Sequence, residues 1–255
     1  MSLLEIEGLN KSFGGLSAVL NFSFQMEKGE LVGLIGPNGA GKTTVFNLIT
    51  GVYKPDQGSM LFMGQDLVGL HPYEICKRGI ARTFQNIRLF KDLTVLDNVR
   101  IAFHKDIHYG FFSAIFRSAS FFRGEQDMER QAMEFLRIFN LDQRRNEIAS
   151  SLPYGEQRRL EIARALATRP TMLILDEPAA GMNPQETKEL MHLIRWLRSE
   201  FNLSILLIEH DMSLVMGVCE RIYVLDYGQV IAEGQPEEIR NNKRVIEAYL
   251  GEEVL

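Results

Sequence analysis

Residues 36–43 read Gly36-Pro37-Asn38-Gly39-Ala40-Gly41-Lys42-Thr43. They match the pattern G-x-x-x-x-G-K-[ST], in which glycines let backbone N–H groups approach phosphate oxygens. An apolar run, Leu31–Ile35, precedes them, and residues 43–49 have the apolar spacing of a helix. This order of strand, loop and helix directs the positive end of a helix at the bound phosphates. We therefore predict a phosphate-binding loop for a nucleoside triphosphate.

Three side chains at the end of the loop and directly after it have expected roles in holding that ligand. Lys42 would hold the β- and γ-phosphates, and the Thr43 hydroxyl would bind Mg²⁺. Thr44 would reach the α-phosphate side. Because the strand and helix patterns flank the motif on both sides, a purely structural glycine turn is the weaker interpretation.

A second apolar run, 172–175, ends in two adjacent acids, Asp176 and Glu177. Ligands collect at the carboxyl ends of strands in open α/β sheets, so these acids are expected near the phosphate loop. One acid can hold Mg²⁺ through water, and the other can orient or deprotonate the attacking water. We assign the first role to Asp176 and the second to Glu177.

Two other polar residues follow predicted strands, but each is ambiguous alone. His210 comes after Ser204–Ile208 and could present its imidazole to a γ-phosphate, although a lone histidine is more often structural. Gln85 follows Thr83 and Phe84, and a glutamine after a strand commonly lies on the surface. Their functional interpretation depends on the other motifs.

Composition limits the compartment and the partners. The chain has 255 residues, of which 45% are hydrophobic, and a net charge of −5, which argues against broad attraction to nucleic acid or anionic lipid. Cys76 and Cys219 lack metal-ligand spacing, and nothing indicates a disulfide framework, so a reducing compartment is expected. Neither an export signal nor an apolar run of ~18 residues is apparent, so any membrane role should be peripheral.

The pattern along the chain predicts an α/β fold. Alternation near the start indicates antiparallel strands, and from residue 164 onward strands and helices alternate, as in a parallel sheet. Between them the sequence is mostly helical, with Thr94 as the expected cap of residues 95–102. We predict one domain, 1–255. Its core, 1–87 and 165–255, has an antiparallel β edge and a mainly parallel sheet, and its inserted helical subdomain is 88–164.

Residues 104–124 are dense in aromatic side chains and allow two interpretations. The more usual one is a helical hairpin that packs locally. The other is a docking surface for a partner, because clustered exposed aromatic residues favour interfaces. The aromatic residues in question are Phe111, Phe112, Phe116, Phe121 and Phe122.

Taken together and in this order, the motifs resemble the nucleotide-binding subunit of ABC transporters over nearly the whole chain. The resemblance implies ATP and Mg²⁺ as cofactors. It also implies that Phe13 stacks on adenine, that Glu177 is the catalytic carboxylate, and that His210 contacts the γ-phosphate. Gln85 would sense Mg²⁺ and the attacking water, so the implied metal site comprises Thr43, Gln85 and Asp176.

The signature sequence of that family aligns with Leu152-Pro153-Tyr154-Gly155-Glu156-Gln157. By the resemblance, Tyr154, Gly155, Glu156 and Gln157 contact the nucleotide held by a facing subunit. The usual form is Leu-Ser-Gly-Gly-Gln, so Pro153 replaces a serine and offers neither hydroxyl nor N–H. Gly155 keeps its amide, and the helix dipole remains, so the contact should be weakened rather than abolished. We therefore predict two unequal composite sites.

With these departures, the sequence resembles that of the ATP-binding subunit of branched-chain amino-acid importers. Asn183 and Phe13 also replace the common aspartate and tyrosine of the wider family. The resemblance implies that ATP closes a dimer with a second, homologous ATPase chain and that hydrolysis reopens it, which powers import. The stretches that carry the likeness are 81–90, 110–113, 152–155, 158–161, 177–184 and 246–251.

Importers of this type are prokaryotic, and the remaining partners follow from the resemblance. They are two integral membrane permease subunits and, indirectly, a solute-binding protein, with no nucleic acid. The chain would sit peripherally on the cytoplasmic face of the membrane, with the permease contact in the helical subdomain near Gln85. In isolation a homodimer is possible.

Two related families are alternatives. The ATPase of the lipopolysaccharide exporter shares the helix sequence at 161–166 and the Tyr-Leu-Gly-Glu sequence at 249–252, but its signature usually keeps serine and two glycines. Soluble ABC ATPases that act on nucleic acid or ribosomes usually carry insertions or tandem cassettes, whereas this chain has one cassette. A module that binds without hydrolysis is disfavoured, because Lys42, Gln85, Asp176, Glu177 and His210 are all present.

Overall fold

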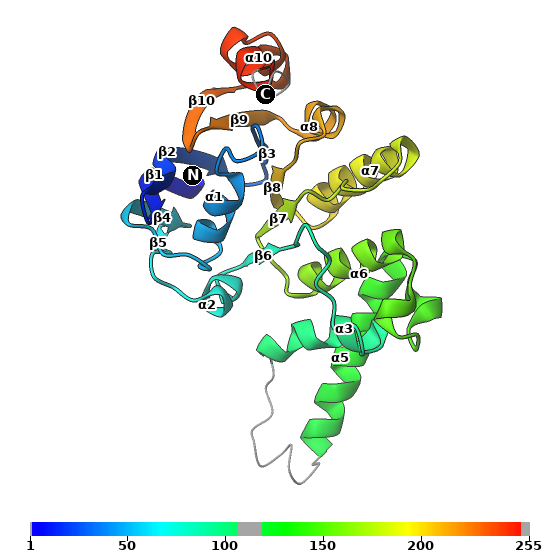
Figure 1. The fold of residues 1–255 in the computed structure, drawn as a ribbon. Coiled ribbons are helices and arrows are strands. Elements are labelled where there is room, and N and C mark those ends of the chain that lie inside the picture. Colours follow the sequence, from blue (N-terminus) through cyan, green and yellow to red (C-terminus); the bar gives the residue numbers. More distant parts are fainter. Residues whose placement is uncertain (1, 107–118, 251–255) are drawn as a thin grey trace. The chain divides into compact units, whose positions relative to one another are not determined.

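The computed structural model describes residues 2–106 and 119–250 (Figure 1). Most of the aromatic stretch, including Phe111, Phe112 and Phe116, lies outside the described residues, as do the 110–113 part of the family likeness and Gly251. The chain divides into two compact units, residues 1–82 with 171–255 and residues 83–170, and each is described by itself.

The first unit contains two β-sheets. The four-stranded sheet is antiparallel, in the order β2-β1-β4-β5. The six-stranded sheet has the order β10-β9-β3-β8-β7-β6, and all its pairs are parallel except β9 with β10. The predicted α/β class, with an antiparallel edge and a mainly parallel core sheet, is confirmed. The strands are β1 (Ser2–Phe13), β2 (Leu16–Glu27), β3 (Leu31–Ile35), β4 (Gln57–Phe62), β5 (Gln65–Asp66), β6 (Ile80–Arg82), β7 (Met172–Asp176), β8 (Ser204–Ile208), β9 (Arg221–Asp226) and β10 (Gln229–Gly234).

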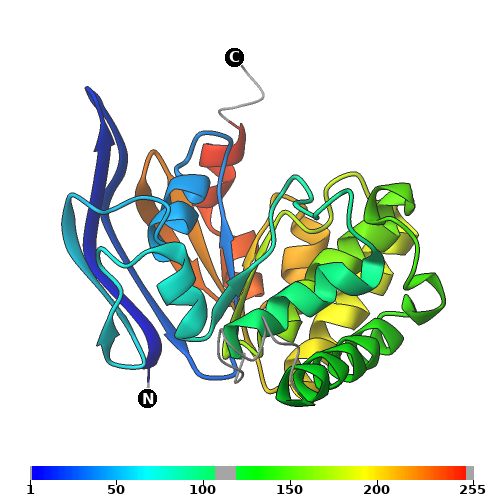
Figure 2. The same cartoon turned by 90° about the horizontal axis from the view of Figure 1, so that it is seen from below.

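Burial explains why the strand sequences differ between the two sheets. Every residue of β3, β7 and β8 is buried, and apart from Asp176 and Ser204 at two strand ends these strands carry no polar side chain, as expected where both faces of a parallel sheet are covered. In contrast, β2 alternates buried with exposed residues along its second half. Helix α1 (Lys42–Ile49) lies between the two sheets, and its Val45 and Phe46 join one apolar core with residues of both (Figure 2).

The remaining helices of the first unit begin at recognisable caps. The Asn183 side chain accepts hydrogen bonds from the backbone N–H groups of Gln185 and Glu186, which fixes the start of α7. Asp211 caps α8 in the same way. These helices are α2 (Pro72–Lys77), α7 (Pro184–Glu200), α8 (Met212–Val218), α9 (Pro236–Arg240) and α10 (Lys243–Leu250).

The second unit is helical. Thr94 caps α3 (Val95–Arg100), as predicted, because its side chain accepts a hydrogen bond from the Asp97 N–H. The helix then continues as a 3₁₀ segment, η1 (Ile101–Asp106), instead of running unbroken to residue 102. The long helix α5 (Ala119–Ile138) and the helix α6 (Tyr154–Ala167) pack with α3 around a small apolar core. The connection between α5 and α6 contains two 3₁₀ turns, η2 (Asp142–Arg144) and η3 (Ala149–Ser151).

Candidate functional site

The predicted phosphate loop runs from the end of β3 to the start of α1. Its Gly36 and Gly41 have φ values of 151° and 102°, which side chains rarely allow. A Cβ atom at Gly36 would collide with the Leu225 carbonyl oxygen of β9, and one at Gly41 would collide with the Ala18 carbonyl oxygen of β2. Only glycine fits at these two positions, so neighbouring strands hold the loop closely.

Lys42 is the first residue of α1, and its ammonium group lies over the loop. Its Nζ donates hydrogen bonds to the carbonyl oxygens of Gly36, at 2.5 Å, and Pro37, at 2.7 Å, and the residue is 7% exposed. The next residue, Thr43, is exposed, and Thr44 is half-buried. The loop therefore holds a positive charge at a helix N-terminus, which is the arrangement that binds phosphate groups.

Glu177 and His210 are brought together by the parallel pairing of β7 with β8, in which Asp176 lies opposite Ile208. Glu177 has a left-handed φ of 43°, and its N–H donates to the Ile208 carbonyl oxygen at 2.8 Å. The His210 Nδ1 lies 3.5 Å from Glu177 Oε2, and the His210 side chain is largely exposed. A non-glycine residue in this conformation costs about 1 kcal/mol or more, so neighbouring contacts such as the bond to Ile208 hold the Glu177 backbone in a strained conformation.

Oxygen donors near the strand ends suit Mg²⁺. Asp176 ends β7 and is 7% exposed, and the Thr43 hydroxyl is available at the start of α1. Within residues 2–106 and 119–250, no group of three or more His, Cys, Asp or Glu side chains is placed to hold a metal ion.

Glu209 is a residue that the sequence interpretation missed. It is fully buried, and its Oε1 accepts a hydrogen bond from the Ala179 N–H at 2.8 Å. Its Oε2 accepts from the N–H groups of His210, at 3.1 Å, and Asp211, at 3.3 Å. The carboxylate thus ties the segment after Glu177 to the segment that carries the histidine. The signal was present, because Glu209 follows an apolar strand just as Asp176 and Glu177 do.

Replacing Glu209 with glutamine is expected to change how stability depends on pH. Burial raises the pKa of the Glu209 carboxyl above its ordinary value of 4.5, so the folded protein binds this proton more tightly than the unfolded chain does. The group's stabilising contribution is therefore full below pH 4.5 and is lost as pH rises through the raised pKa. Urea unfolding is measured at a series of pH values. As the pH rises above 4.5, the free energy of unfolding of the wild type should fall relative to that of Glu209→Gln. A constant difference at every pH would contradict this assignment.

Phe13 ends β1, and the residue is 42% exposed, as a platform for a base requires. The ring of Tyr53 meets it edge to face, with centroids 5.1 Å apart. The Lys11 Nζ lies 5.4 Å from the centroid of the Phe13 ring and forms an ion pair of 2.8 Å with Asp56. Tyr53 and Lys11 thus both contact the ring of the predicted stacking residue. Neither contact was expected from the sequence.

The signature residues and Gln85 belong to the second unit. Pro153 is the N-cap residue of α6, and no side chain caps this helix among the residues described. The N–H groups of Glu156 and Gln157 instead donate to the Pro153 carbonyl oxygen, both at 3.0 Å. Tyr154 is exposed, and a Cβ atom at Gly155 would meet no atom within 4 Å in the described part of the chain outside its own helical turn. The start of α6 is therefore open, but it lacks the hydroxyl that a serine would supply. Gln85 is exposed and follows β6.

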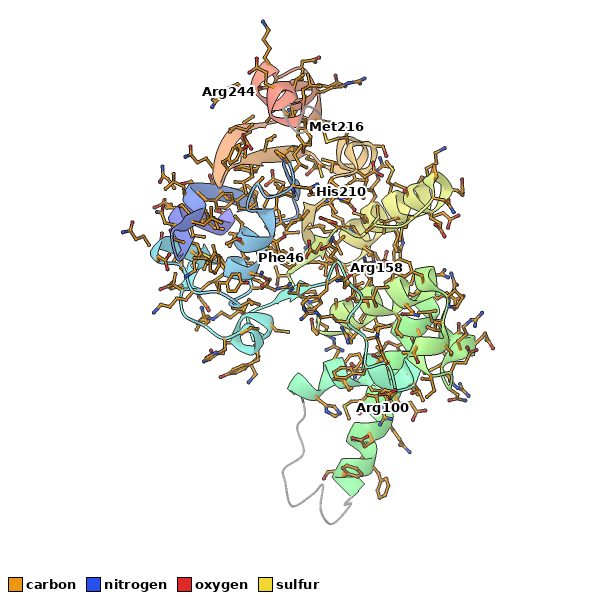
Figure 3. The ribbon with its side chains drawn as sticks, in the orientation of Figure 1. Phe46, Arg100, Arg158, His210, Met216 and Arg244 are labelled. Atoms are coloured by element: carbon orange, nitrogen blue, oxygen red, sulfur yellow. The ribbon has the colours of Figure 1, made fainter. Side chains whose placement is uncertain are left out.

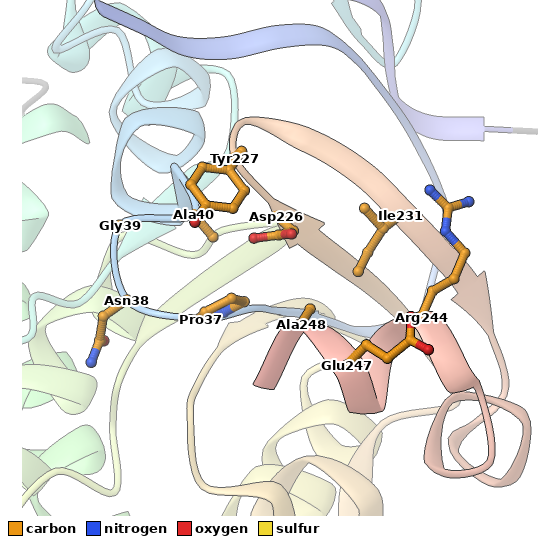
Figure 4. Close-up of a pocket in the computed structure, with 10 residues that line it drawn as sticks. All are labelled: Pro37, Asn38, Gly39, Ala40, Asp226, Tyr227, Ile231, Arg244, Glu247 and Ala248. Carbon is orange, nitrogen blue, oxygen red and sulfur yellow. The ribbon is translucent and has the colours of Figure 1, made fainter. Parts of the chain in front are cut away.

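The outer side of the phosphate loop borders a cavity of about 480 Å³ (Figure 4). Four residues of the predicted phosphate loop, 37–40, line it, whereas Lys42 and Phe13 are not among its lining residues. Helix α10 forms one wall, which places the C-terminal part of the chain beside the loop. The lining residues are Pro37, Asn38, Gly39, Ala40, Asp226, Tyr227, Ile231, Arg244, Glu247 and Ala248.

Comparison with known proteins identifies similar sequences. Residues 19–180 match the family model described as ABC transporter, and residues 229–254 match the one described as branched-chain amino acid ATP-binding cassette transporter. The chain is 52% identical over 250 residues, 98% of each chain, to the high-affinity branched-chain amino acid transport ATP-binding protein LivG of Escherichia coli K12. It is 35% identical over 255 residues, 99% of each chain, to the lipopolysaccharide export system ATP-binding protein LptB of Haemophilus influenzae.

Solved structures are similar as well. The ADP conformation of MJ1267, an ATP-binding cassette of an ABC transporter, superposes with a TM-score of 0.85 at 32% identity, covering 98% of this chain and 99% of that one. A dimeric post-hydrolysis state of the cassette MJ0796, bound to ADP and Pi, has a TM-score of 0.77 at 26% identity and covers 91% and 98%. Among residues 2–106 and 119–250, none of the helices combines the length and the hydropathy that a membrane span needs.

Proposed function

Since the chain belongs to the ABC transporter family of ATPases, we propose that it is the ATP-hydrolysing subunit that powers an importer of branched-chain amino acids. The observation that carries this proposal is the 52% identity to LivG over 98% of both chains. The match of residues 229–254 to the branched-chain amino acid model supports it independently of the ATPase motifs. The lipopolysaccharide exporter is the weaker candidate, since identity to LptB is 35%.

In this function the phosphate loop and Lys42 bind the β- and γ-phosphates of ATP. Thr43, Gln85 and Asp176 would hold Mg²⁺, which neutralises the charge that develops on the phosphates during transfer. Glu177 orients the attacking water and accepts its proton, and His210, 3.5 Å from that carboxylate, contacts the γ-phosphate. Phe13 stacks on adenine. These assignments give Lys42, Glu177 and His210 roles in hydrolysis.

The proposed importer contains further subunits besides this chain. A second, homologous ATPase chain would supply the signature that closes over this chain's ATP, and the residues Tyr154 to Gln157 would close over the partner's. The dimeric state of the similar cassette MJ0796 supports pairing of this kind. Two permease subunits in the membrane and a solute-binding protein would make up the importer, with this chain on the cytoplasmic face. ATP binding shifts the permeases between states only if the closed dimer binds ATP more tightly than the open one.

The proposal is tested by purifying the chain with its membrane partners. The complex, reconstituted in vesicles with the solute-binding protein, should take up leucine, isoleucine or valine only when ATP is present on the cytoplasmic side. Lys42→Met in the same complex is the control, because uptake should then stop. A complex that binds lipopolysaccharide and takes up none of the three amino acids would favour the exporter instead.

Replacing Pro153 with serine is expected to raise ATP turnover in the complex by about two- to tenfold. The serine would add a hydroxyl at the partner's γ-phosphate, and one net hydrogen bond contributes about 0.5–1.5 kcal/mol. It would also cap α6, which begins without a side-chain cap within the described residues. Turnover is measured by phosphate release at saturating ATP.

Pro236→Ser is the matched control for that change. Pro236 occupies the first turn of α9, so its replacement removes a helix-starting proline without touching the signature. Turnover in this variant should match the wild type. The proposed inequality of the two composite sites fails if Pro153→Ser leaves turnover unaltered and removal of the partner's signature serine is equally harmless.

A further inference from the structure

Arg158 is a buried arginine on the helix that follows the signature. It lies on α6 with 1% exposure, one turn after Tyr154 (Figure 3). Its NH1 donates to the Phe84 carbonyl oxygen at 2.6 Å, and its NH2 donates to the Gln85 carbonyl oxygen at 3.0 Å. The planar fork of the guanidinium thus spans two successive peptide groups, which a lysine could not do.

Glu161 completes the arrangement from the next turn of α6. Its Oε2 accepts from Arg158 NH1 at 2.9 Å, and its Oε1 accepts from the Arg88 N–H at 3.0 Å. Its side chain is also 1% exposed. Between them the two side chains hold the backbone at both ends of the segment 84–88, which itself contains no helix or strand. We call this segment the glutamine loop. Its shape depends on α6.

Stability alone does not account for the pair. Burying two opposite charges is expensive, and replacement of both by apolar residues is often neutral or stabilising. Removal of one partner, in contrast, leaves an uncompensated buried charge. What the pair supplies and an apolar pair could not is a fixed position for three backbone groups of the glutamine loop. A cation–π contact joins α6 to the residues just after the glutamine loop, since the Arg164 guanidinium lies 5.5 Å from the centroid of the Phe90 ring.

We propose that Arg158 and Glu161 are positioning residues that make the glutamine loop and the signature helix move as one body. The proposal rests on the proposed function, in which Gln85 senses the nucleotide of this chain and Tyr154 to Gln157 contact the nucleotide of the partner. The pair then connects the two composite ATP sites through this one chain. Engagement of the signature by the partner's ATP sets the position of Gln85, so the two sites act cooperatively.

The test uses the double variant Arg158→Met, Glu161→Leu in the complete importer. It removes both charges together, so it avoids the unpaired buried charge of a single substitution. The Hill coefficient of ATP hydrolysis, which for two coupled sites can approach about two, should fall to about one. The maximal rate should drop about tenfold, equivalent to roughly 1.4 kcal/mol of barrier. Binding of a fluorescent ATP analogue to the isolated chain should stay within about twofold, because the phosphate loop is unchanged.

Two further variants decide between positioning and general damage. Arg159 lies beside Arg158 on α6, but it is exposed, and its guanidinium lies 3.8 Å from the Glu156 carboxylate. The Hill coefficient of Arg159→Met should therefore match the wild type. Arg158→Lys keeps the charge but loses the fork, and it should recover part of the rate and of the Hill coefficient. If the double variant is unstable by circular dichroism, Arg158→Lys serves as the test.

The outcomes separate this inference from the proposed function. Suppose the wild-type importer hydrolyses ATP cooperatively. If the double variant or Arg158→Lys then has the same Hill coefficient as the wild type, the proposed role of the pair is overturned. A wild-type Hill coefficient of one also overturns it. A wild-type complex that takes up no branched-chain amino acid rejects the proposed function and leaves the Hill coefficient to decide the pair.

Discussion

Glu177→Gln is expected to lower steady-state ATP hydrolysis by about 100-fold or more while ATP still binds. Glutamine has the same size and can occupy the same backbone conformation, whose N–H bond to the Ile208 carbonyl oxygen does not involve the side chain. An amide cannot accept the proton of the attacking water, so the loss falls on the chemical step. Phosphate release measures the rate, and the variant should retain unhydrolysed ATP after gel filtration.

That variant should also stay dimeric with its partner in ATP, because reopening depends on hydrolysis. The matched control is Glu200→Gln, at the exposed end of α7, which should hydrolyse ATP at the wild-type rate. Unchanged steady-state turnover in Glu177→Gln would remove Glu177 as the catalytic carboxylate. The neighbouring Asp176 would then be the residue to test.

Local patterns predicted the parts of the fold that depend on short stretches of sequence. The apolar runs of β3, β7 and β8 are recognisable because both faces of these strands are buried. Thr94 was expected as a cap because the N-cap position selects a few polar side chains. The order of the antiparallel sheet was not predicted, since pairing of β1 with β4 joins segments about fifty residues apart and leaves no local signal.

In the candidate site, too, some features could be predicted from the sequence and others could not. The proximity of Glu177 to His210 follows from topology, because neighbouring parallel strands end at the same edge of a sheet. The sequence did not single out Glu209, because one acid at a strand end gains a structural role only from the groups that donate hydrogen bonds to it. Its three N–H donors lie on two segments that are far apart in the sequence. Arg158 and Glu161 were noted only as part of a family likeness. Their burial depends on packing of the glutamine loop, which the helical spacing of α6 does not encode.

Lys42→Met is expected to weaken ATP binding by about 100-fold or more. Hydrogen bonds from a charged donor contribute about 1.5–3 kcal/mol each, and Lys42 would make them to two phosphate groups. Methionine fills the space of the lysine stem, and the site is nearly buried, so the loop should keep its fold. The carbonyl oxygens of Gly36 and Pro37 lose their hydrogen bonds to Lys42, so the cost in stability falls on the loop and not on the rest of the fold. Titration with a fluorescent ATP analogue measures the affinity.

Lys54→Met provides the control for charge, because Lys54 is an exposed lysine shortly after α1. Its affinity for ATP should equal that of the wild type, and the thermal midpoints of both variants should lie close to the wild-type value. A Lys42→Met chain that binds ATP within about threefold of the wild type would mean that the loop's backbone N–H groups and the dipole of α1 hold the phosphates alone. In that case Lys42 would act on the transition state, and the loss would appear in the rate of hydrolysis.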